Sequence, residues 1–341
     1  MREPDQSQGR PAHGADTRRS LAALLVPDLE ILETGQGFDE LEPAQGLVSV
    51  IVPSYAHEEF VEEALRSIVK QTYRKLELIL IDDHSPDRTF DRALSCLRDS
   101  TLPYCAIRRR HAGMEANLNA GILLARGEWI AMLASDDVFL ERSMETLMAA
   151  AVEENADVAV GHVDDITRDG QFKCSRAEAV ARYSGMSGNA LRKALLVEHG
   201  SMMIQGLLIS RKVFAQAGLF DPGLFASDFD FLLRMASSGA RFTVVQGATA
   251  LHRQTRKHLS REHLRSGLHS HLAIARRHAR SLTEYRHAAA RFRVETALNN
   301  LHYGYPVDAI TCLTQACFTA PWVATGIVAD RLLGKLGKKR G

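Results

Sequence analysis

The sequence predicts an α/β fold whose central sheet is mainly parallel and covered by helices on both faces. Short runs rich in Val, Ile and Leu alternate along the chain with segments in which apolar residues recur at helical spacing. The strand-like runs are apolar almost throughout, which is typical of strands buried between two layers of helices. At 341 residues with 45% hydrophobic content, the chain has the length of one large domain with appendages or of two small domains.

The predicted elements follow one another from residue 47. The expected strands cover residues 47–53, 76–82, 104–109, 128–134 and 157–163, and the expected helices cover residues 57–71, 85–97, 115–125 and about 140–152. Ser85 stands where it could cap the second helix, with Pro86 at the first helical position. A short helical patch is also expected over residues 21–32.

Composition and charge exclude several classes of protein. A net charge of +1 argues against a nucleic-acid-binding protein, which usually carries a marked basic excess. The five cysteines are odd in number and scattered, without a C-x-x-C pair, so we expect a reducing cytoplasm, no disulfide framework and no zinc ribbon. Residues 1–45 begin with a polar stretch that lacks the apolar core of a secretory signal, and we expect a largely disordered N-terminal extension there.

The C-terminal segment raises the question of a membrane. Residues 309–329 carry no charge and are followed by the basic tail GKLGKKRG at 334–341. Four Thr residues, Gln315 and Pro321 make the segment weakly apolar for a membrane span. We therefore expect a helix that docks on the protein or lies on a membrane surface, with the tail available to anionic lipid.

Three of the predicted strands end on polar pairs, namely Ser54–Tyr55, Asp82–Asp83 and Asp136–Asp137. Because ligands of parallel sheets bind beyond the carboxyl ends of the strands, we expect these ends to share one crevice. Adjacent carboxylates repel each other, and two arrangements would offset this repulsion in the third pair. Asp137 could cap a helix that starts near Val138, or the pair could bind a divalent cation through its oxygens.

The crevice offers several carboxylates, an aromatic ring at Tyr55 and the cations of residues 108–110. No G-x-G-x-x-G follows the first strand and no G-x-x-x-x-G-K-[ST] occurs, so dinucleotide redox enzymes and P-loop NTPases fit poorly. A nucleoside diphosphate fits, with its base stacked on the ring and cations near its phosphates. Tyr55 could instead be a turn residue that packs on the sheet edge.

From residue 48 to residue 260 the chain resembles the family 2 glycosyltransferases with the GT-A fold. The matching stretches are VSVIVPSY at 48–55, QTYRKLELILIDDHSPDRT at 71–89, HAGMEANLNAGILLARGEWIAML at 111–133, SDD at 135–137, GLFDPGLFASDFDFLLRMASSG at 218–239 and HRQTRKHLS at 252–260. The resemblance implies a GT-A catalytic domain with a Rossmann-like nucleotide-binding half over residues 46–260. A helical C-terminal region with a basic tail is then expected over residues 261–341.

The resemblance also implies roles for single residues. Asp228 corresponds to the general base, Asp137 to the ligand of Mn²⁺ or Mg²⁺, and Asp136 to a contact with the sugar or ribose of the nucleotide donor. The other implied contacts are with the nucleotide at Pro53, Ser54, Tyr55, Asp82 and Asp83, with the donor pocket at Gly113 and Asn119, and with the acceptor at Arg253 and Ser260. From the residues alone, Ser227 or Asp228 could instead cap a helix, and Asp230 is expected to be solvated.

The activity implied by the resemblance is inverting transfer of a sugar from a nucleotide donor, with UDP as the expected carrier and dTDP or GDP as the alternatives. The expected acceptor is a hydroxyl of a glycan or lipid-linked glycan in cell-surface polysaccharide biosynthesis. The expected location is the cytoplasm, including the inner face of the cell membrane, which the C-terminal helix and basic tail would contact.

Five positions depart from the family pattern: Ala56, His84, Ala134, Ser227 and Thr255 stand where Asn, Gly, Asp, Glu and His are frequent. The last three favour an alternative function, a catalytically weak nucleotide-sugar-binding or scaffold protein of the same fold. A third interpretation, a nucleotidyltransferase, would need a Gly-rich phosphate loop where this chain has PSYAHEEF at 53–60.

Overall fold

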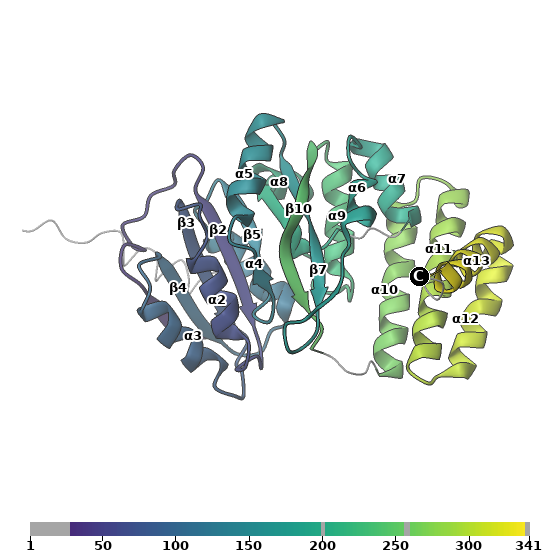
Figure 1. The fold of residues 1–341 in the computed structure, drawn as a ribbon, viewed down its shortest axis with the longest axis horizontal. Coiled ribbons are helices and arrows are strands. Elements are labelled where there is room, and N and C mark those ends of the chain that lie inside the picture. Colours follow the sequence, from purple (N-terminus) through teal and green to yellow (C-terminus); the bar gives the residue numbers. More distant parts are fainter. Residues whose placement is uncertain (1–27, 199–201, 256–259, 338–341) are drawn as a thin grey trace, which may run out of the picture.

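The structure is a computed structural model that describes residues 28–198, 202–255 and 260–337. One sheet runs through the α/β part, helices cover its faces, and the C-terminal helices lie beside it (Figure 1). The strands are β1 (Leu29–Thr34), β2 (Val48–Ser54), β3 (Leu76–Asp82), β4 (Tyr104–Arg109), β5 (Trp129–Met132), β6 (Val138–Phe139), β7 (Val158–Ile166), β8 (Phe172–Cys174), β9 (Leu207–Ser210) and β10 (Phe242–Arg253). The α-helices are α2 (Val61–Val69), α3 (Thr89–Arg98), α4 (Met114–Leu124), α5 (Ser143–Glu153), α6 (Ala177–Ala181), α7 (Gly188–Glu198), α8 (Arg211–Ala217), α9 (Ser227–Ser237), α10 (Arg261–His278), α11 (Leu282–His302), α12 (Pro306–Thr319) and α13 (Pro321–Gly337), and Ile204–Gly206 form a 3₁₀ turn.

The strand order in the sheet is β1-β4-β3-β2-β5-β9-β7-β10-β6, with β8 paired to β7. The central strands β4, β3, β2 and β5 are parallel, as are β7 and β10, which confirms the predicted mainly parallel central sheet. Strands β1, β6, β8 and β9 add antiparallel pairs. In this register Ser54 of β2 lies opposite Asp82 of β3, so polar strand ends meet at one edge of the sheet.

Alternate residues of the central strands lie on opposite faces of the sheet, because successive side chains of a strand point to opposite sides. Ile51 and Ile79 belong to the core that includes residues of α4 and α9, whereas Val50 and Leu78 belong to the core that includes residues of α2, α3 and α5. All four side chains are fully buried, and burial of each stabilises the fold by about 1.5–3 kcal/mol. Helices on both faces explain why these strands are apolar throughout.

Part of one predicted helical segment is a strand in the structure. Residues 29–34 form β1, which pairs with β4, so the helical patch expected over residues 21–32 is wrong for that part. The rest of the patch, and residues 1–27 of the predicted N-terminal extension, lie outside the described residues.

Helix α3 begins at Thr89, four residues later than predicted. Ser85 does not cap it, because Ser85 donates from both its backbone N–H and its hydroxyl to the carboxylate of Asp82, at 2.9 and 2.5 Å. Asp87 instead accepts from the backbone N–H of Thr89 at 3.0 Å. The residues before α3 are therefore held in a turn that belongs to the end of β3.

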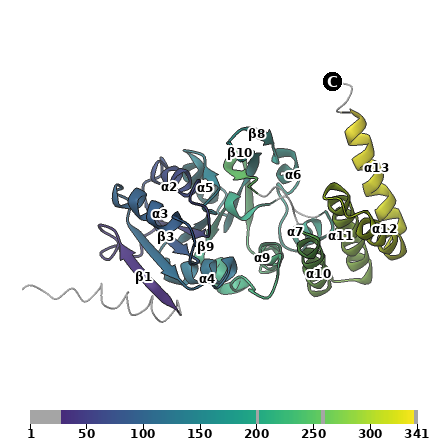
Figure 2. The same cartoon turned by 90° about the horizontal axis from the view of Figure 1, so that it is seen from below.

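The C-terminal region is helical, as predicted, and it shares a core with the α/β part. Ile274 of α10 and Phe292 of α11 belong to the same apolar cluster as Phe229 of α9. Pro321 separates α12 from α13, so the uncharged segment 309–329 forms parts of two helices, and α13 projects away from the sheet (Figure 2). Within the described ranges, none of the helices combines the length and the apolar character that crossing a membrane requires.

Candidate functional site

Two neighbouring cavities open at the carboxyl ends of β2, β3 and β5. The first, here called the Asp83 cavity, has a volume of about 520 Å³ and is lined by Asp83 and by the loop at residues 53–60. The second, called the Asp228 cavity, has a volume of about 540 Å³ and is lined by Asp136, Asp137 and Asp228. The two cavities share five lining residues: Pro53, His57, Met114, Ala134 and Thr255. The structure therefore joins the three polar strand ends in one crevice.

Asp83 holds the wall of its cavity in place. Its carboxylate accepts hydrogen bonds from the backbone N–H groups of Ala112 and Gly113, at 2.7 and 3.1 Å, and lies 2.7 Å from Nδ1 of His111. Gly113 has a φ of 91°, which residues with a Cβ rarely adopt, so glycine is required where the chain turns into α4. The Asp83 carboxylate thus orients residues 111–113 along the cavity.

Asp82, predicted to contact a nucleotide, supports this edge of the sheet instead. Its side chain is fully buried and lines neither cavity. Its carboxylate accepts from the hydroxyl of Ser54 at 2.9 Å and from both the backbone and the hydroxyl of Ser85. The two adjacent carboxylates therefore differ in role, because Asp82 faces the turns within the protein while Asp83 borders the cavity.

Tyr55 lies at the mouth of the Asp83 cavity and is 47% exposed. Its ring centroid is 5.1 Å from that of His111, so two rings stand together at the opening. This exposure does not match the alternative in which Tyr55 packs on the sheet edge. An exposed ring beside a cavity can stack on a planar base.

Two departures from the family pattern lie where the backbone is left-handed. Ala56 and His84 have φ values of 55° and 60°, in the left-handed region. This conformation costs a residue with a Cβ about 1–2 kcal/mol, whereas Gly adopts it freely and Asn tolerates it. The Asn and Gly expected at these positions suit the backbone, so Ala56 and His84 change local strain at the site.

Asp137 is almost fully buried in the Asp228 cavity. Nε2 of Gln205 donates to one of its carboxylate oxygens at 3.0 Å, and the backbone N–H of Arg253 donates to the other at 2.9 Å. Burial, reinforced by the negative charge of Asp136, raises the pKa of Asp137 to about 7. The surrounding groups therefore do not fully compensate the charge of the carboxylate, and a cation would complete the compensation.

Asp136 lies where the two cavities meet. Thr255 donates from its hydroxyl to the Asp136 carboxylate at 3.2 Å, and Nε2 of His57 lies 3.5 Å from the same oxygen. The other ring nitrogen of His57 lies 2.9 Å from the hydroxyl of Ser135. His57 and Thr255 line both cavities, so they link Asp136 to each of them.

The helix-capping alternative for Asp137 is wrong. Val138 and Phe139 form the short strand β6, which pairs with β10, and the next helix, α5, begins only at Ser143. The repulsion between the adjacent carboxylates is therefore not offset by a helix N-terminus. Of the two alternatives, cation binding is the one that stays a prediction.

The residues present fit a divalent metal that shares its coordination with a substrate. Within the described ranges, there is no group of three or more His, Cys, Asp or Glu side chains that could hold a metal alone. Asp137, with its raised pKa, and Asp136 beside it offer oxygen ligands of the kind that Mn²⁺ and Mg²⁺ prefer. An ion held by so few protein ligands would need oxygen atoms from a bound substrate.

Asp228 lies in the first turn of α9 with its side chain exposed to the Asp228 cavity. One carboxylate oxygen accepts from the backbone N–H of Phe229 at 2.8 Å. The cap position is Ala226, which makes no capping bond, so the predicted capping by Ser227 or Asp228 is wrong. The hydroxyl of Ser227 donates to Glu115 of α4 at 2.9 Å, which brings a second carboxylate to the residue before Asp228.

Asn119, predicted to line the donor pocket, lies outside both cavities. Its amide donates to the carbonyl of Phe220 and accepts from the backbone N–H of the same residue, each at 2.9 Å. It therefore ties α4 to the segment that precedes α9. Gly113 does line the Asp83 cavity, and so does Asn117, which the sequence analysis did not select.

The two residues predicted on the acceptor side make hydrogen bonds and an ion pair within the protein. The guanidinium of the buried Arg253 donates to the backbone carbonyls of Asp136 and Arg168, at 3.1 and 2.8 Å, and pairs with Glu63 at 2.6 Å. Although Arg253 lines the Asp228 cavity, its donors hold the loops around the site. Ser260 lines neither cavity and caps α10 by accepting from the backbone N–H of His263 at 3.1 Å.

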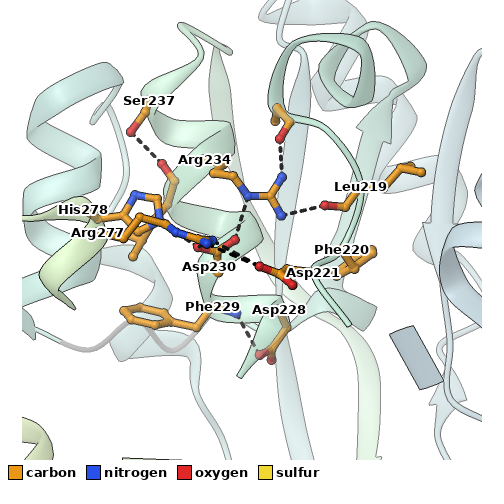
Figure 3. Close-up of polar contacts among 12 residues, drawn as sticks. Leu219, Phe220, Asp221, Asp228, Phe229, Asp230, Arg234, Ser237, Arg277 and His278 are labelled. Atoms are coloured by element: carbon orange, nitrogen blue, oxygen red, sulfur yellow. Dashed lines mark hydrogen bonds and ion pairs between the residues drawn. The ribbon is translucent and has the colours of Figure 1, made fainter. Parts of the chain in front are cut away.

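Asp230 is fully buried, so the prediction that it is solvated is wrong. Figure 3 shows the side chains of Arg234, Arg277 and His278 gathered around its carboxylate, which they approach to 2.7, 3.2 and 2.8 Å. Burial alone would raise the pKa of Asp230, but hydrogen bonds from His278 and Arg234 outweigh it and hold the pKa well below its usual range. This cluster fastens α9, which carries Asp228, to the end of α10.

Several residues at the cavities escaped the sequence analysis for different reasons. His57 had a usable signal, because it follows Tyr55 closely in the loop after β2. Asn117 is a polar residue in a largely apolar helix, which also could have drawn attention. Gln205 has no local signal, since it meets Asp137 only through the pairing of distant strands.

Comparisons with known proteins agree with this geometry. The sequence profile described as "Glycosyl transferase family 2" matches residues 49–216. The chain is 33% identical over 127 residues to the glycosyltransferase GlyG of Streptococcus pneumoniae, which is 37% of this chain and 42% of that protein. It is 34% identical over 112 residues to a Campylobacter jejuni GalNAc(5)-diNAcBac-PP-undecaprenol beta-1,3-glucosyltransferase, covering 33% of this chain and 36% of the relative. The chain thus spans less than half the length of these two curated relatives.

Solved structures support the fold. S. aureus TarS 1–349, determined in complex with UDP-GlcNAc, has a TM-score of 0.57 at 16% identity and covers 82% of each chain. The mannosyltransferase PcManGT of Pyrobaculum calidifontis, in complex with GDP-Man and Mn²⁺, has a TM-score of 0.53 at 22% identity, covering 85% of this chain and 80% of that one. At these identities the likeness concerns the fold. The profile match identifies residues 49–216 as a glycosyl transferase family 2 domain, and the likeness to the solved structures shows that the chain has the GT-A fold.

Proposed function

We propose that the protein is an inverting glycosyltransferase that moves a sugar from a nucleotide diphosphate to a hydroxyl of a glycan or lipid-linked glycan. The observation that carries the proposal is the placement of an exposed carboxylate, Asp228, in the same cavity as the half-buried Asp136 and the buried Asp137. The reaction needs a general base for the acceptor hydroxyl and groups that stabilise the negative charge of the leaving diphosphate.

The Asp83 cavity is the proposed site of the nucleoside. Tyr55 offers a stacking surface at its mouth, and Asp83 offers a carboxylate that can accept from a base or a ribose hydroxyl. We infer UDP as the carrier, and the TarS neighbour, which was determined with UDP-GlcNAc, supports this choice. The shared residues His57 and Thr255 would then lie near the diphosphate, between nucleoside and sugar.

Asp228 is the proposed general base. It accepts the proton of the acceptor hydroxyl as the hydroxyl oxygen forms a bond to the anomeric carbon. The bond from that carbon to the diphosphate oxygen breaks in the same displacement, and the nucleoside diphosphate leaves. Attack from the face opposite the leaving group inverts the anomeric configuration.

Asp137, with Asp136 beside it, would hold the divalent metal. When bound, Mn²⁺ or Mg²⁺ supplies Lewis-acid stabilisation of the negative charge on the leaving diphosphate. Gln205 and the backbone of Arg253 fix the Asp137 carboxylate in the cavity, so its oxygens are oriented before the substrate arrives.

The acceptor and the location are also proposals. The Campylobacter jejuni relative is named for transfer to an undecaprenol-linked glycan, which supports a lipid-linked acceptor in polysaccharide biosynthesis. All five cysteines are free, which suits the reducing cytoplasm. We therefore place the protein in the cytoplasm, at the inner face of the membrane that would carry such an acceptor.

A thermal-shift screen of nucleotide sugars, with and without Mn²⁺, tests the donor proposal. A ligand at about 100 times its Kd stabilises the native state by about 2.7 kcal/mol, so the correct donor should raise the Tm clearly. We expect UDP-sugars to give the largest shift and Mn²⁺ to increase it. The selected donor is then incubated with lipid-linked acceptors, and NMR of the product reports the anomeric configuration. Retention of configuration would contradict the inverting mechanism.

The alternative function, a nucleotide-sugar-binding or scaffold protein without strong catalysis, rests on Ala134, Ser227 and Thr255. The contacts of two of these residues argue against it, because Thr255 still donates to Asp136 and Ser227 still binds the carboxylate of Glu115. Binding of UDP-sugars with no transfer and no donor hydrolysis would favour the scaffold.

We propose in addition that the C-terminal helices contact an anionic bilayer. Four large apolar side chains are 64–88% exposed on α12 and α13, and we call them the C-terminal apolar face: Val307, Ile310, Phe318 and Trp322. Residues 309–329 carry no charge, and the sequence of the tail at 334–341 supplies three Lys and one Arg. Exposed aromatic rings beside basic residues are the combination that binds the interface of an anionic membrane.

Vesicle flotation tests this contact. We expect the protein to float with vesicles containing phosphatidylglycerol but not with pure phosphatidylcholine, and the double variant Phe318→Ser, Trp322→Ser to lose most of this binding. Phe172→Ser is the matched control, because Phe172 of β8 is also 65% exposed but lies outside the C-terminal helices. Equal flotation of wild type and double variant would contradict the proposal.

A further inference from the structure

Asn117 is a buried amide without a partner. It lies in α4, its side chain is 1% exposed, and it lines the Asp83 cavity. Neither its Oδ1 nor its Nδ2 has a hydrogen-bond partner among residues 28–198, 202–255 and 260–337. Each unsatisfied buried polar atom is unfavourable, so an amide that leaves both atoms unpaired needs a physical reason.

A second asparagine on α4 shows that an amide on this helix can find hydrogen-bond partners within the protein. Asn119, two residues further along, makes both of its hydrogen bonds to the backbone of Phe220. In the part of the chain that the structure describes, the other buried side chains with an unpaired atom each leave one atom unpaired, whereas Asn117 leaves two. Rules of packing are most often broken at functional sites, where a ligand supplies the missing partner.

The chemistry of the cavity indicates which ligand fits. An amide offers an N–H donor and a carbonyl acceptor side by side, while the carboxylate of Asp83 only accepts. Three donors already approach Asp83, from Ala112, Gly113 and His111, which leaves about one of its four lone-pair directions for a ligand. The imide edge of uracil presents one N–H flanked by two carbonyl oxygens, so it can donate to Asp83 and accept from Asn117. Cytosine has its acceptor nitrogen in the middle of that edge and its donor amine at one end, so its donor does not lie between two acceptors as it does in uracil.

We propose that Asn117 is a specificity-determining residue for the base of the donor nucleotide, and that it selects a uracil-type imide together with Asp83. This inference rests on the proposed function, since it assumes that a nucleoside diphosphate occupies the Asp83 cavity. Tyr55 and His111 at the cavity mouth provide rings on which the same base would stack.

The test compares Asn117→Leu with wild-type protein by isothermal titration of UDP and of CDP in the presence of Mn²⁺. Wild type is expected to bind UDP more tightly than CDP. In Asn117→Leu, UDP binding should weaken about tenfold, which corresponds to the loss of one good hydrogen bond, and the preference over CDP should shrink. Because leucine fills a similar volume without unpaired polar atoms, the ligand-free variant should melt about 3 °C higher than wild type.

A gain in stability together with a loss of ligand binding separates this role from a structural one. Asn119→Ala is the matched control on the same helix, and we expect it to melt at a lower temperature while its UDP affinity stays close to wild type. Asn117→Ala provides a second variant in case leucine does not fit, with the same expected loss of UDP affinity.

Two results would overturn the inference alone: unchanged UDP affinity in both Asn117 variants, or a ligand-free Asn117→Leu that is less stable than wild type, which would mean that water satisfies the amide within the fold. Wild-type protein that binds none of the nucleoside diphosphates would instead overturn the proposed function on which the inference rests. The two failures are therefore distinguishable.

Discussion

Replacement of Asp228 by Asn is expected to lower the rate of sugar transfer by about 10²–10⁴-fold, the usual contribution of a general base. The amide has the shape of the carboxylate but cannot accept the acceptor's proton. Because Asp228 is exposed and bonds only locally, to the backbone N–H of Phe229, Asp228→Asn should keep the Tm of wild type. Nucleotide affinity should also be unchanged, since Asp228 does not line the Asp83 cavity. Single-turnover rates and titration of UDP together measure these expectations.

Glu115→Gln is the control that makes the assignment of the base specific. Glu115 accepts a hydrogen bond from the hydroxyl of Ser227, the residue before Asp228. It is therefore a second carboxylate near the proposed base. We expect this variant to keep transfer within about tenfold of wild type, because a neutral amide can still bond to the hydroxyl. A severe loss in Glu115→Gln, combined with near-normal turnover in Asp228→Asn, would assign the proton transfer to Glu115 instead.

The largest expected effect on stability comes from Asp230→Asn, which should lower the free energy of unfolding by about 3 kcal/mol. Removal of one partner from a buried ion pair typically costs about 3–5 kcal/mol, because the remaining charges are left uncompensated. Arg234, which is itself largely buried, would lose the carboxylate that neutralises it, and the buried His278 ring would lose its hydrogen-bond contact at 2.8 Å. Chemical denaturation followed by fluorescence or circular dichroism measures the change.

Asp221→Asn is the matched control for this cluster, since Asp221 pairs with the half-exposed Arg277, at 3.3 Å, and is itself 37% exposed. An asparagine can still accept from the backbone N–H of Gly223, which bonds to the Asp221 carboxylate at 3.0 Å. Ion pairs of this kind contribute about 0–1 kcal/mol, so the control should stay close to wild type. A loss of stability in Asp221→Asn as large as that in Asp230→Asn would show that the burial of Asp230 is not the cause of its larger expected effect.

The same cluster predicts a pH dependence with a defined sign. The pKa of Asp230 is held below its value of about 3.9 in an unfolded chain, so its contribution is fully present above about pH 4–5. As the pH falls further, through the depressed pKa of the folded protein, that contribution is lost. The difference in unfolding free energy between wild type and Asp230→Asn should therefore shrink below about pH 4. A constant difference down to pH 2 would contradict the charged state assigned to Asp230.

Much of the fold could be predicted because its signals are local. The strand expected over residues 76–82 has the bounds of β3, and the predicted strand over residues 104–109 has those of β4. Apolar runs that alternate with helical patterns reveal such elements without any long-range information. By contrast, β1 and β6 exist because they pair with β4 and β10, and neither has enough local pattern to be recognised.

The sequence alone also determined which strand ends carry polar chemistry, and hence where the crevice lies, because parallel strands bring their carboxyl ends to one edge. It could not decide which of two adjacent carboxylates is buried. That choice depends on residues far away in the chain: Gln205 and Arg253, which bind Asp137, are 68 and 116 positions from it. Only the tertiary structure brings such partners together, and burial among them, rather than residue type, sets the charge and the role of each carboxylate.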